Sequence, residues 1–312
     1  MDWRSPTMRT SKVVLVVFLW ALCYPLIALG LAGSPPLLLA AMRASAAGVL
    51  MLVTGALLGR PLPQGWTQWL GIAVIGLGTA SLGFGGMFLA GGRISPGLAT
   101  VLSSTQPLLA AMLGYVALDE RLGRARVAAL ALGIAGVGLV ASSNFESDAS
   151  SGMAGILYVL LAAVGVAVGN VLLKHLAGRL DPLMGLGGQF ALGSLPLWAA
   201  SIALEDPARF AWSRSLILVY AALVLLGTVI PALLWFALLE REDLNRMNAF
   251  TFLTPIFALL LGAAFFNERL APLQWAGTAL VIAAVMLSVF YRSPRHPAEV
   301  LRESAATLSH DG

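Results

Sequence analysis

The chain has 312 residues, of which 59% are hydrophobic and only 11% are charged. Soluble globular proteins carry about 45–50% apolar and about 25% charged residues, so this composition excludes a water-soluble protein and predicts a polytopic membrane protein. The net charge of +4 is not a sign of nucleic-acid binding here, because basic residues of membrane proteins collect in cytoplasmic loops.

Ten apolar stretches are each long enough to cross about 30 Å of hydrocarbon as a helix. They lie at 13–32, 36–58, 67–90, 95–118, 124–142, 153–177, 182–203, 215–239, 247–266 and 272–291. Membrane-spanning strands are excluded, because the stretches are too long and do not alternate between apolar and polar residues. We therefore expect an all-α protein with ten transmembrane helices.

The basic residues orient these spans. If the N-terminus is cytoplasmic, Arg43 lies within a span and most other basic residues fall inside the cell. The basic residues left outside are Arg93, Arg209, Arg214 and Arg269. This asymmetry predicts a cytoplasmic N-terminus (1–12), a cytoplasmic tail (292–312) and an external central linker (143–152).

The sequence repeats itself at a long interval. The segment from Pro107 to Gly114 is followed by Asp119-Glu120-Arg121-Leu122, and the segment from Pro255 to Gly262 is followed by Asn267-Glu268-Arg269-Leu270. Shorter matches agree with this repeat. Gly78-Thr79 corresponds to Gly227-Thr228, and Arg43 corresponds to Gln189.

The repeat divides the chain into two halves, 13–142 and 153–291, and each half holds five predicted spans. Because five is odd, the second half enters the membrane with the opposite orientation. Inverted repeats are typical of secondary transporters, whose site lies between the halves near mid-membrane. A duplication kept only for packing gives the same pattern, but we favour transport because inverted halves supply two related gating conformations.

With its two Pro…Gly…Glu-Arg-Leu endings, the sequence resembles the EamA-type members of the drug/metabolite transporter superfamily. The resemblance covers about residues 13–291, and Trp20 and Arg43 also resemble family positions. One departure is Asp119, where the second half has Asn267. The resemblance implies a carrier in the bacterial inner membrane that exports an amino acid or another small metabolite.

The expected partners are therefore a small-molecule solute and the lipid bilayer, with no nucleic acid, cofactor or metal, and a homodimer is left open. A carrier for drugs or amines is the alternative. An intramembrane enzyme is disfavoured because the chain lacks a His-Glu-x-x-His motif and a Cys/His cluster. A non-transporting scaffold is disfavoured because the predicted loops are short.

Arg43 is the one charge well inside a predicted span. Burying a guanidinium there costs at least ~2.5 kcal/mol unless it is paired or faces water. One interpretation is an anchor for a solute carboxylate, since arginine forms bidentate pairs with carboxylates. The other is a structural arginine that binds free carbonyls at a break in a neighbouring helix. Gln189, at the matching position of the second half, is a candidate for the same site.

Two prolines are predicted to kink their spans. Pro107 and Pro255 each remove the hydrogen bond to the carbonyl four residues earlier. Polar residues precede each of them, and these are candidates to line a hydrated cavity. The candidates are Ser103 and Gln106 before the first proline, and Thr251 and Thr254 before the second. Alternatively, the hydroxyl groups bind only their own helix.

Aromatic residues complete the predicted site. Trp20 and Tyr24 are one helical turn apart and are expected to share a face, and Trp235 lies in the eighth span. An aromatic pocket would suit an amphipathic solute, although packing alone explains any single aromatic residue. Asn170 is a polar exception in the sixth span, and its alternative role is a hydrogen bond between helices.

Overall fold

The computed structural model describes residues 6–106, 109, 124–142, 149–176, 180–239, 253–266 and 271–290. Helices make up almost all of this part, and the described residues form no strand, so the predicted all-α class is confirmed. The first half contains α1 (Pro6–Ala21), α2 (Cys23–Gly30), α3 (Pro36–Leu57), α4 (Trp66–Gly76), η1 (Leu77–Phe84), α5 (Gly85–Ala90), α6 (Pro96–Ser103) and α8 (Arg124–Ser142). The second half contains α9 (Ala149–Leu176), α10 (Pro182–Leu204), η3 (Pro207–Arg209), α11 (Arg214–Val224), η4 (Leu225–Val229), α12 (Ile230–Leu239), α14 (Leu253–Phe266) and α15 (Pro272–Phe290).

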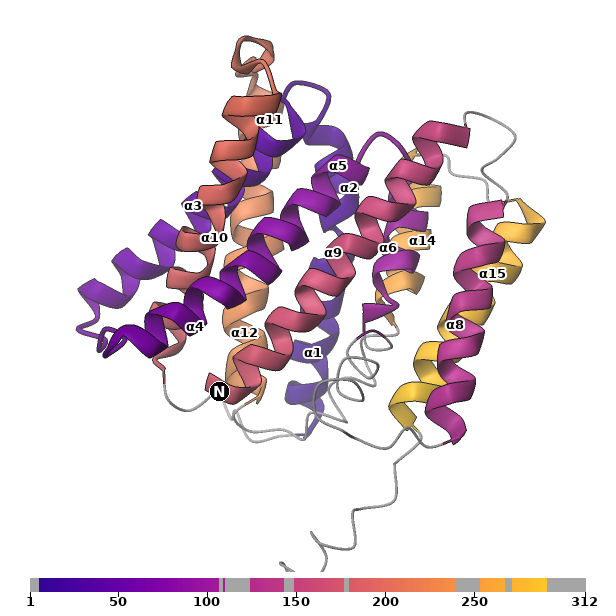
Figure 1. The fold of residues 1–312 in the computed structure, drawn as a ribbon, viewed down its shortest axis with the longest axis horizontal. Coiled ribbons are helices and arrows are strands. Elements are labelled where there is room, and N and C mark those ends of the chain that lie inside the picture. The colour runs from indigo at the N-terminus through magenta and orange to yellow at the C-terminus, as the bar shows by residue number, and fades with distance from the viewer. Residues whose placement is uncertain are drawn as a thin grey trace, which may run out of the picture.

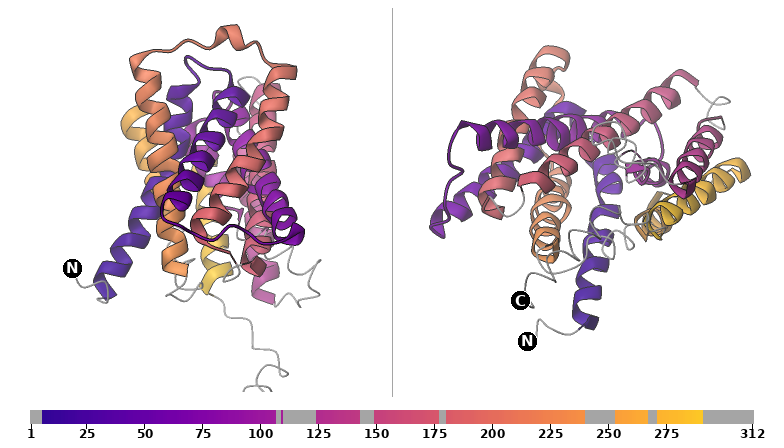
Figure 2. Two further views of the ribbon diagram at one scale, coloured as in Figure 1. Left: turned by 90° about the vertical axis from the view of Figure 1, so that its left-hand side faces the viewer. Right: turned by 60° about the horizontal axis from the view of Figure 1, so that its bottom comes forward.

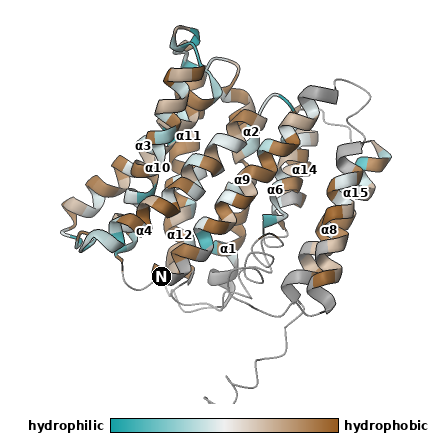
Figure 3. Ribbon diagram, viewed as in Figure 1, coloured by the Kyte–Doolittle hydropathy of each residue, from teal (hydrophilic) through white to brown (hydrophobic). Residues whose placement is uncertain are grey.

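Several helices of the described part are long and apolar enough to cross a membrane. They are Ser11–Gly30, Pro36–Leu57, Trp66–Ala90, Gly152–Asn170 and Arg214–Leu238. Val127–Leu139, Ile256–Phe266 and Pro272–Ala284 are shorter apolar helices. The hydropathy colouring agrees, because hydrophilic residues gather at the connections α3–α4 and α10–α11 while apolar residues cover the helices (Figure 3). The structure therefore fits a membrane protein, and the number of ten spans stays a prediction.

One predicted boundary is shifted in the structure, and two predicted spans are only partly described. The helix α9 begins at Ala149, inside the segment expected to be a linker, because small polar residues extend the helix beyond the apolar run. The predicted spans 95–118 and 247–266 are described only in part, by α6 and α14. The rest of each lies outside the described residues.

The first span is interrupted in its middle. The helix α1 ends at Ala21 and α2 begins at Cys23, with Leu22 in a turn between them. Proline has no N–H group, so Pro25 cannot bond the Ala21 carbonyl four residues earlier. The interruption thus follows from one residue.

The third and eighth spans each contain a π-helical segment. The segment η1 lies between α4 and α5, and η4 lies between α11 and α12. Gly78-Thr79 falls in η1, and its repeat partner Gly227-Thr228 falls in η4. A π-helical turn inserts one extra residue into a helix and is frequent at functional sites.

The axes of the helices are broadly aligned, and helices of one half pack on helices of the other (Figures 1 and 2). The pairs α3–α10, α6–α14 and α8–α15 each join one helix of the first half to one of the second. In addition, α1 packs on α12 and η1 packs on α9. The pair α8–α15 stands at the right-hand edge of Figure 1.

Close backbone contact holds α3 against α10. A Cβ atom added to Gly48 would lie 2.5 Å from the Ala191 nitrogen and 2.9 Å from the Gly187 oxygen. Only a residue without a side chain allows this approach, because the neighbouring atoms of Ala191 and Gly187 belong to the backbone and cannot move aside. The pair α3–α10 therefore forms a close contact between the halves.

Candidate functional site

Arg43 lies in α3 and is 1% exposed. Its Nε donates to the Thr228 hydroxyl at 2.9 Å, and its Nη2 donates to the Gly227 carbonyl at 3.1 Å. Nη2 also lies 3.4 Å from the Cys23 sulfur. The guanidinium of the first half is therefore bound by the π-helical segment η4 of the second half.

The sequence of the eighth span explains why these acceptors are free. In an α-helix the Gly227 carbonyl would accept from the N–H of residue 231, but that residue is proline. The Thr228 hydroxyl donates to the Leu223 carbonyl five residues earlier, at 3.0 Å. Its donor hydrogen is thus used, and its oxygen is left to accept from Arg43.

Aromatic rings cover one face of the guanidinium. Its central carbon lies 4.2 Å from the ring centre of Phe84 and 5.8 Å from that of Phe88. Phe84 stacks on Phe190 of α10, with ring centres 5.6 Å apart. Cation–π contact is strongest where water is absent, so these rings stabilise the buried charge.

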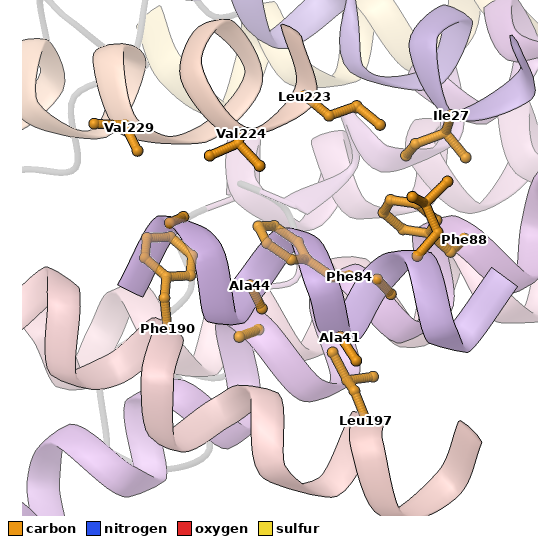
Figure 4. Close-up of a cluster of buried hydrophobic side chains, with 14 of the residues drawn as sticks. Ile27, Ala41, Ala44, Phe84, Phe88, Phe190, Leu197, Leu223, Val224 and Val229 are labelled. Atoms are coloured by element: carbon orange, nitrogen blue, oxygen red, sulfur yellow. The ribbon is translucent and has the colours of Figure 1, made fainter. Parts of the chain in front are cut away.

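Figure 4 shows the apolar surroundings of these rings. The side chains of Phe190, Phe84 and Phe88 lie in a row, facing aliphatic side chains of the second half and of α2. The aliphatic residues are Leu223, Val224, Val229 and Ile27. The surroundings therefore combine one positive charge with an apolar aromatic row.

Some polar atoms near the centre of the molecule have no hydrogen-bond partner among the described residues. They include Nη1 of Arg43, Oε1 of Gln189 and the hydroxyl of Tyr24, all on side chains that are less than 5% exposed. Leaving a buried polar group unpaired costs about 1–3 kcal/mol, and more for a charged group. Arg43 and Gln189 lie on the packed pair α3–α10, so the two matching positions flank the contact between the halves.

The predicted aromatic residues divide between two places. Trp20 packs against Trp235, with ring centres 4.9 Å apart, in a cluster built by α1, α12 and α14. Tyr24 packs in a different cluster with residues of α5, α6 and α9. The Leu22 nitrogen donates to the Phe18 carbonyl and the Leu26 nitrogen donates to the Leu22 carbonyl, so helical bonding continues through the turn. The shared face of Trp20 and Tyr24 stays a prediction, although the two rings pack in different clusters.

The remaining predicted residues contribute less to the geometry around Arg43. Ser103 donates to the Thr100 carbonyl of its own helix at 2.9 Å, as the alternative interpretation expected. Gln106 and Thr254 are half-buried, and Asn170 is exposed on α9. Pro107 and Thr251 lie outside the described residues. Pro255 lies in the first turn of α14. The carbonyl that it would leave without a hydrogen bond belongs to Thr251, so the predicted kink lies partly outside the described residues and stays a prediction.

Sequence reasoning missed the partners of Arg43. Gly227 and Thr228 had been noted only as a repeat of Gly78-Thr79. The signal that identifies them is Pro231, four residues after Gly227, because it frees one carbonyl inside an apolar span. Cys23 carried no such signal, since a lone thiol in an apolar run is ordinary.

Carboxylates lie at the ends of α10, away from the guanidinium. Glu205 accepts from the backbone nitrogens of Leu37 and Leu38 at 2.7 and 2.8 Å. Asp181 caps the start of α10 and lies 3.9 Å from the Arg60 side chain. Within the described residues, no group of three or more His, Cys, Asp or Glu side chains could hold a metal ion.

The sequence matches the model of the EamA-like transporter family twice, over residues 11–142 and 153–290. A WAT1-related chloroplastic protein of Arabidopsis thaliana is 32% identical over 266 residues, covering 82% of this chain and 63% of that protein. An uncharacterised transporter of Synechocystis is 31% identical and covers 86% of each chain.

A probable amino-acid metabolite efflux pump of Escherichia coli is 28% identical, covering 89% of this chain and 93% of the pump. A solved crystal structure matches the fold with a TM-score of 0.64 at 21% identity, over 91% of this chain and 97% of that one.

Proposed function

This chain belongs to the EamA-like transporter family, and on that premise we propose that it exports a small amphipathic carboxylate, such as an amino acid, by alternating access. It is a multi-pass membrane transporter rather than an enzyme. The observation that carries the proposal is the Nη1 group of Arg43, a buried donor with no partner among the described residues. A solute carboxylate would supply the missing acceptor.

The surroundings of Arg43 support an amphipathic solute. The aromatic row of Phe84, Phe88 and Phe190 offers an apolar surface beside the charge. A buried guanidinium repels cationic solutes, so the proposal favours a carboxylate over the drug or amine alternative. The relatives named as probable amino-acid metabolite efflux pumps agree with this solute class. We propose that Gln189, Tyr24 and the pair Trp20–Trp235 shape the pathway around it.

The contacts between helices support alternating access. Exchange of the two halves converts the contacts of α1 with η4 and α12 into those of α9 with η1 and α5, and it leaves α3–α10 and α8–α15 unchanged. Two halves related in this way can form two conformations of equal architecture that open to opposite sides. The guanidinium is enclosed in the described conformation, so solute entry requires the halves to move.

We further propose ten spans in the bacterial inner membrane, with both termini cytoplasmic. Accessibility labelling tests this topology, with Ser147→Cys or Gly312→Cys introduced into a Cys23→Ser background. The two positions are expected to react from opposite sides of the membrane. Reaction of both positions from the same side would refute the inverted arrangement.

Transport is tested in proteoliposomes with radiolabelled phenylalanine, leucine and methionine, and with their amides, which lack the negative charge. The expected result is flux of at least one acid in preference to its amide. Arg43→Gln should lower Vmax/KM for that acid by about tenfold or more, because hydrogen bonds to charged groups contribute about 1.5–3 kcal/mol. The exposed Arg209 provides the control, and Arg209→Gln should transport normally.

The proposal fails in either of two cases. One is that folded wild-type protein carries none of these acids in preference to its amide. The other is that Arg43→Gln and Arg209→Gln transport alike.

A further inference from the structure

The two halves use the same Gly-Thr pair in different ways. Thr79 in η1 donates to the Ile75 carbonyl of its own helix, four residues earlier, at 2.9 Å. Thr228 in η4 donates five residues back, to Leu223, and also accepts from Nε of Arg43. The two threonines therefore occupy matching positions of the repeat, and Thr228 is the one that accepts a hydrogen bond from Arg43.

The contacts of Thr228 and Gly227 leave the guanidinium little freedom to turn. Nε is bound by the Thr228 hydroxyl, Nη2 is bound by the Gly227 carbonyl, and Phe84 covers one face. The Nε–Nη2 edge is thus occupied by the protein itself. Nη1 is the donor group that remains for a solute.

A planar group held along one edge and on one face presents its remaining donor in one direction. A freely turning arginine would have to be immobilised when a solute binds, and this loss of freedom weakens binding. The hydroxyl of Thr228 removes that cost in advance. Only a solute that bonds to Nη1 binds more tightly because Arg43 is already fixed, and a solute that makes no bond to Nη1 gains nothing.

We propose that Thr228 is a positioning residue that fixes Arg43 for the carboxylate of the solute and so sets the selectivity for acids over their amides, which lack the carboxylate. This inference rests on the proposed function, since it assigns a cause to the carboxylate preference of the same site. Thr228 acts through Arg43 and does not itself bind the solute.

The test compares Vmax/KM for phenylalanine, leucine and methionine with the values for their amides, in proteoliposomes. Thr228→Val has nearly the same shape as threonine and lacks the acceptor, so it should lower the acid/amide ratio by about fivefold. Thr228→Ser keeps the hydroxyl and should restore the ratio. Thr79→Val makes the same substitution at the matching position and should leave the ratio unchanged.

The double variant Arg43→Gln/Thr228→Val separates positioning from general damage. Once the guanidinium is absent, loss of the hydroxyl should change the acid/amide ratio no further. A merely structural role for Thr228 would lower the flux of acid and amide alike. Should Thr228→Val not fold, Thr228→Ala is measured against Thr228→Ser instead.

Two results overturn the inference while the proposed function stands. The first is an unchanged acid/amide ratio in Thr228→Val, and the second is an equal fall in Thr79→Val. If wild-type protein shows no preference for any acid over its amide, the proposed function fails and the inference fails with it.

Discussion

Glu205 joins the two halves at one end of the pair α3–α10. It follows the last residue of α10, and its carboxylate accepts from the backbone nitrogens of Leu37 and Leu38 in the first turn of α3. The Ser201 hydroxyl also donates to it, at 2.9 Å. The first N–H groups of a helix have no acceptor within the helix, and the helix dipole adds attraction for a negative charge there.

The magnitude follows from these contacts. Glu205→Ala leaves two partly buried N–H groups and one hydroxyl without this acceptor. Hydrogen bonds to charged groups contribute about 1.5–3 kcal/mol each, and the lower value applies to a partly exposed site. Counting only the two bonds from backbone N–H groups, at about 1.5 kcal/mol each, we expect Glu205→Ala to lower the free energy of unfolding by about 3 kcal/mol. Glu205→Gln keeps one acceptor oxygen and should lose about half as much.

The assay is thermal unfolding in detergent, followed by tryptophan fluorescence. In a chain of this length, a loss of about 3 kcal/mol corresponds to a fall in Tm of about 5 °C. The neighbouring acid Asp206 is the control, because it is exposed and accepts from the Ala208 nitrogen of the short segment η3. Asp206→Ala should cost less than about 1 kcal/mol. Equal falls in Tm for Glu205→Ala and Asp206→Ala would refute this reasoning.

Two further predictions use the same purified protein. Gly48→Ala should lower the free energy of unfolding by about 1–3 kcal/mol, because its methyl group would meet backbone atoms of α10. Gly138→Ala meets open space and should be neutral or stabilising, so similar melting curves for the two variants would contradict the close contact. Cys23 is the one cysteine of the chain and is 3% exposed. Its reaction with N-ethylmaleimide should be slow in native protein and fast in sodium dodecyl sulfate, and rapid native labelling would show that the thiol is accessible.

Much of the helical layout could be predicted from the sequence. The apolar stretches 36–58 and 182–203 correspond to α3 (Pro36–Leu57) and α10 (Pro182–Leu204). Both helices begin with proline, whose missing N–H costs nothing in a first turn. Long apolar stretches in such a chain leave few alternatives to helices, because their backbone groups must be satisfied within the segment.

The interruptions within the spans were harder to predict. Pro25 explains the turn at Leu22 once the structure is seen, but proline is common in membrane helices and does not always break them. The segments η1 and η4 contain no proline of their own. Hydrophobic periodicity does not record such π-helical turns, because apolar residues continue through both segments.

The sequence singled out Arg43 but not the residues of the second half that bind it. Arg43 was conspicuous because a charge within a span is costly. Its partners Gly227 and Thr228 lie more than 180 residues away in the chain, and they looked like ordinary small residues of an apolar helix. The packing of Trp20 and Tyr24 in separate clusters could not be predicted either, because helical spacing does not say which other helices lie beside a residue.

The amino-acid sequence by itself determined that the chain is a helical membrane protein of two related halves. Its apolar content and its repeated Glu-Arg-Leu endings can both be recognised without knowing how the helices pack. Tertiary structure alone decided which of two equivalent threonines binds the guanidinium. The reason is local geometry. Both hydroxyls donate to a carbonyl of their own helix, but the packing of the halves places the Thr228 hydroxyl 2.9 Å from Nε of Arg43, beside the Gly227 carbonyl that Pro231 leaves free.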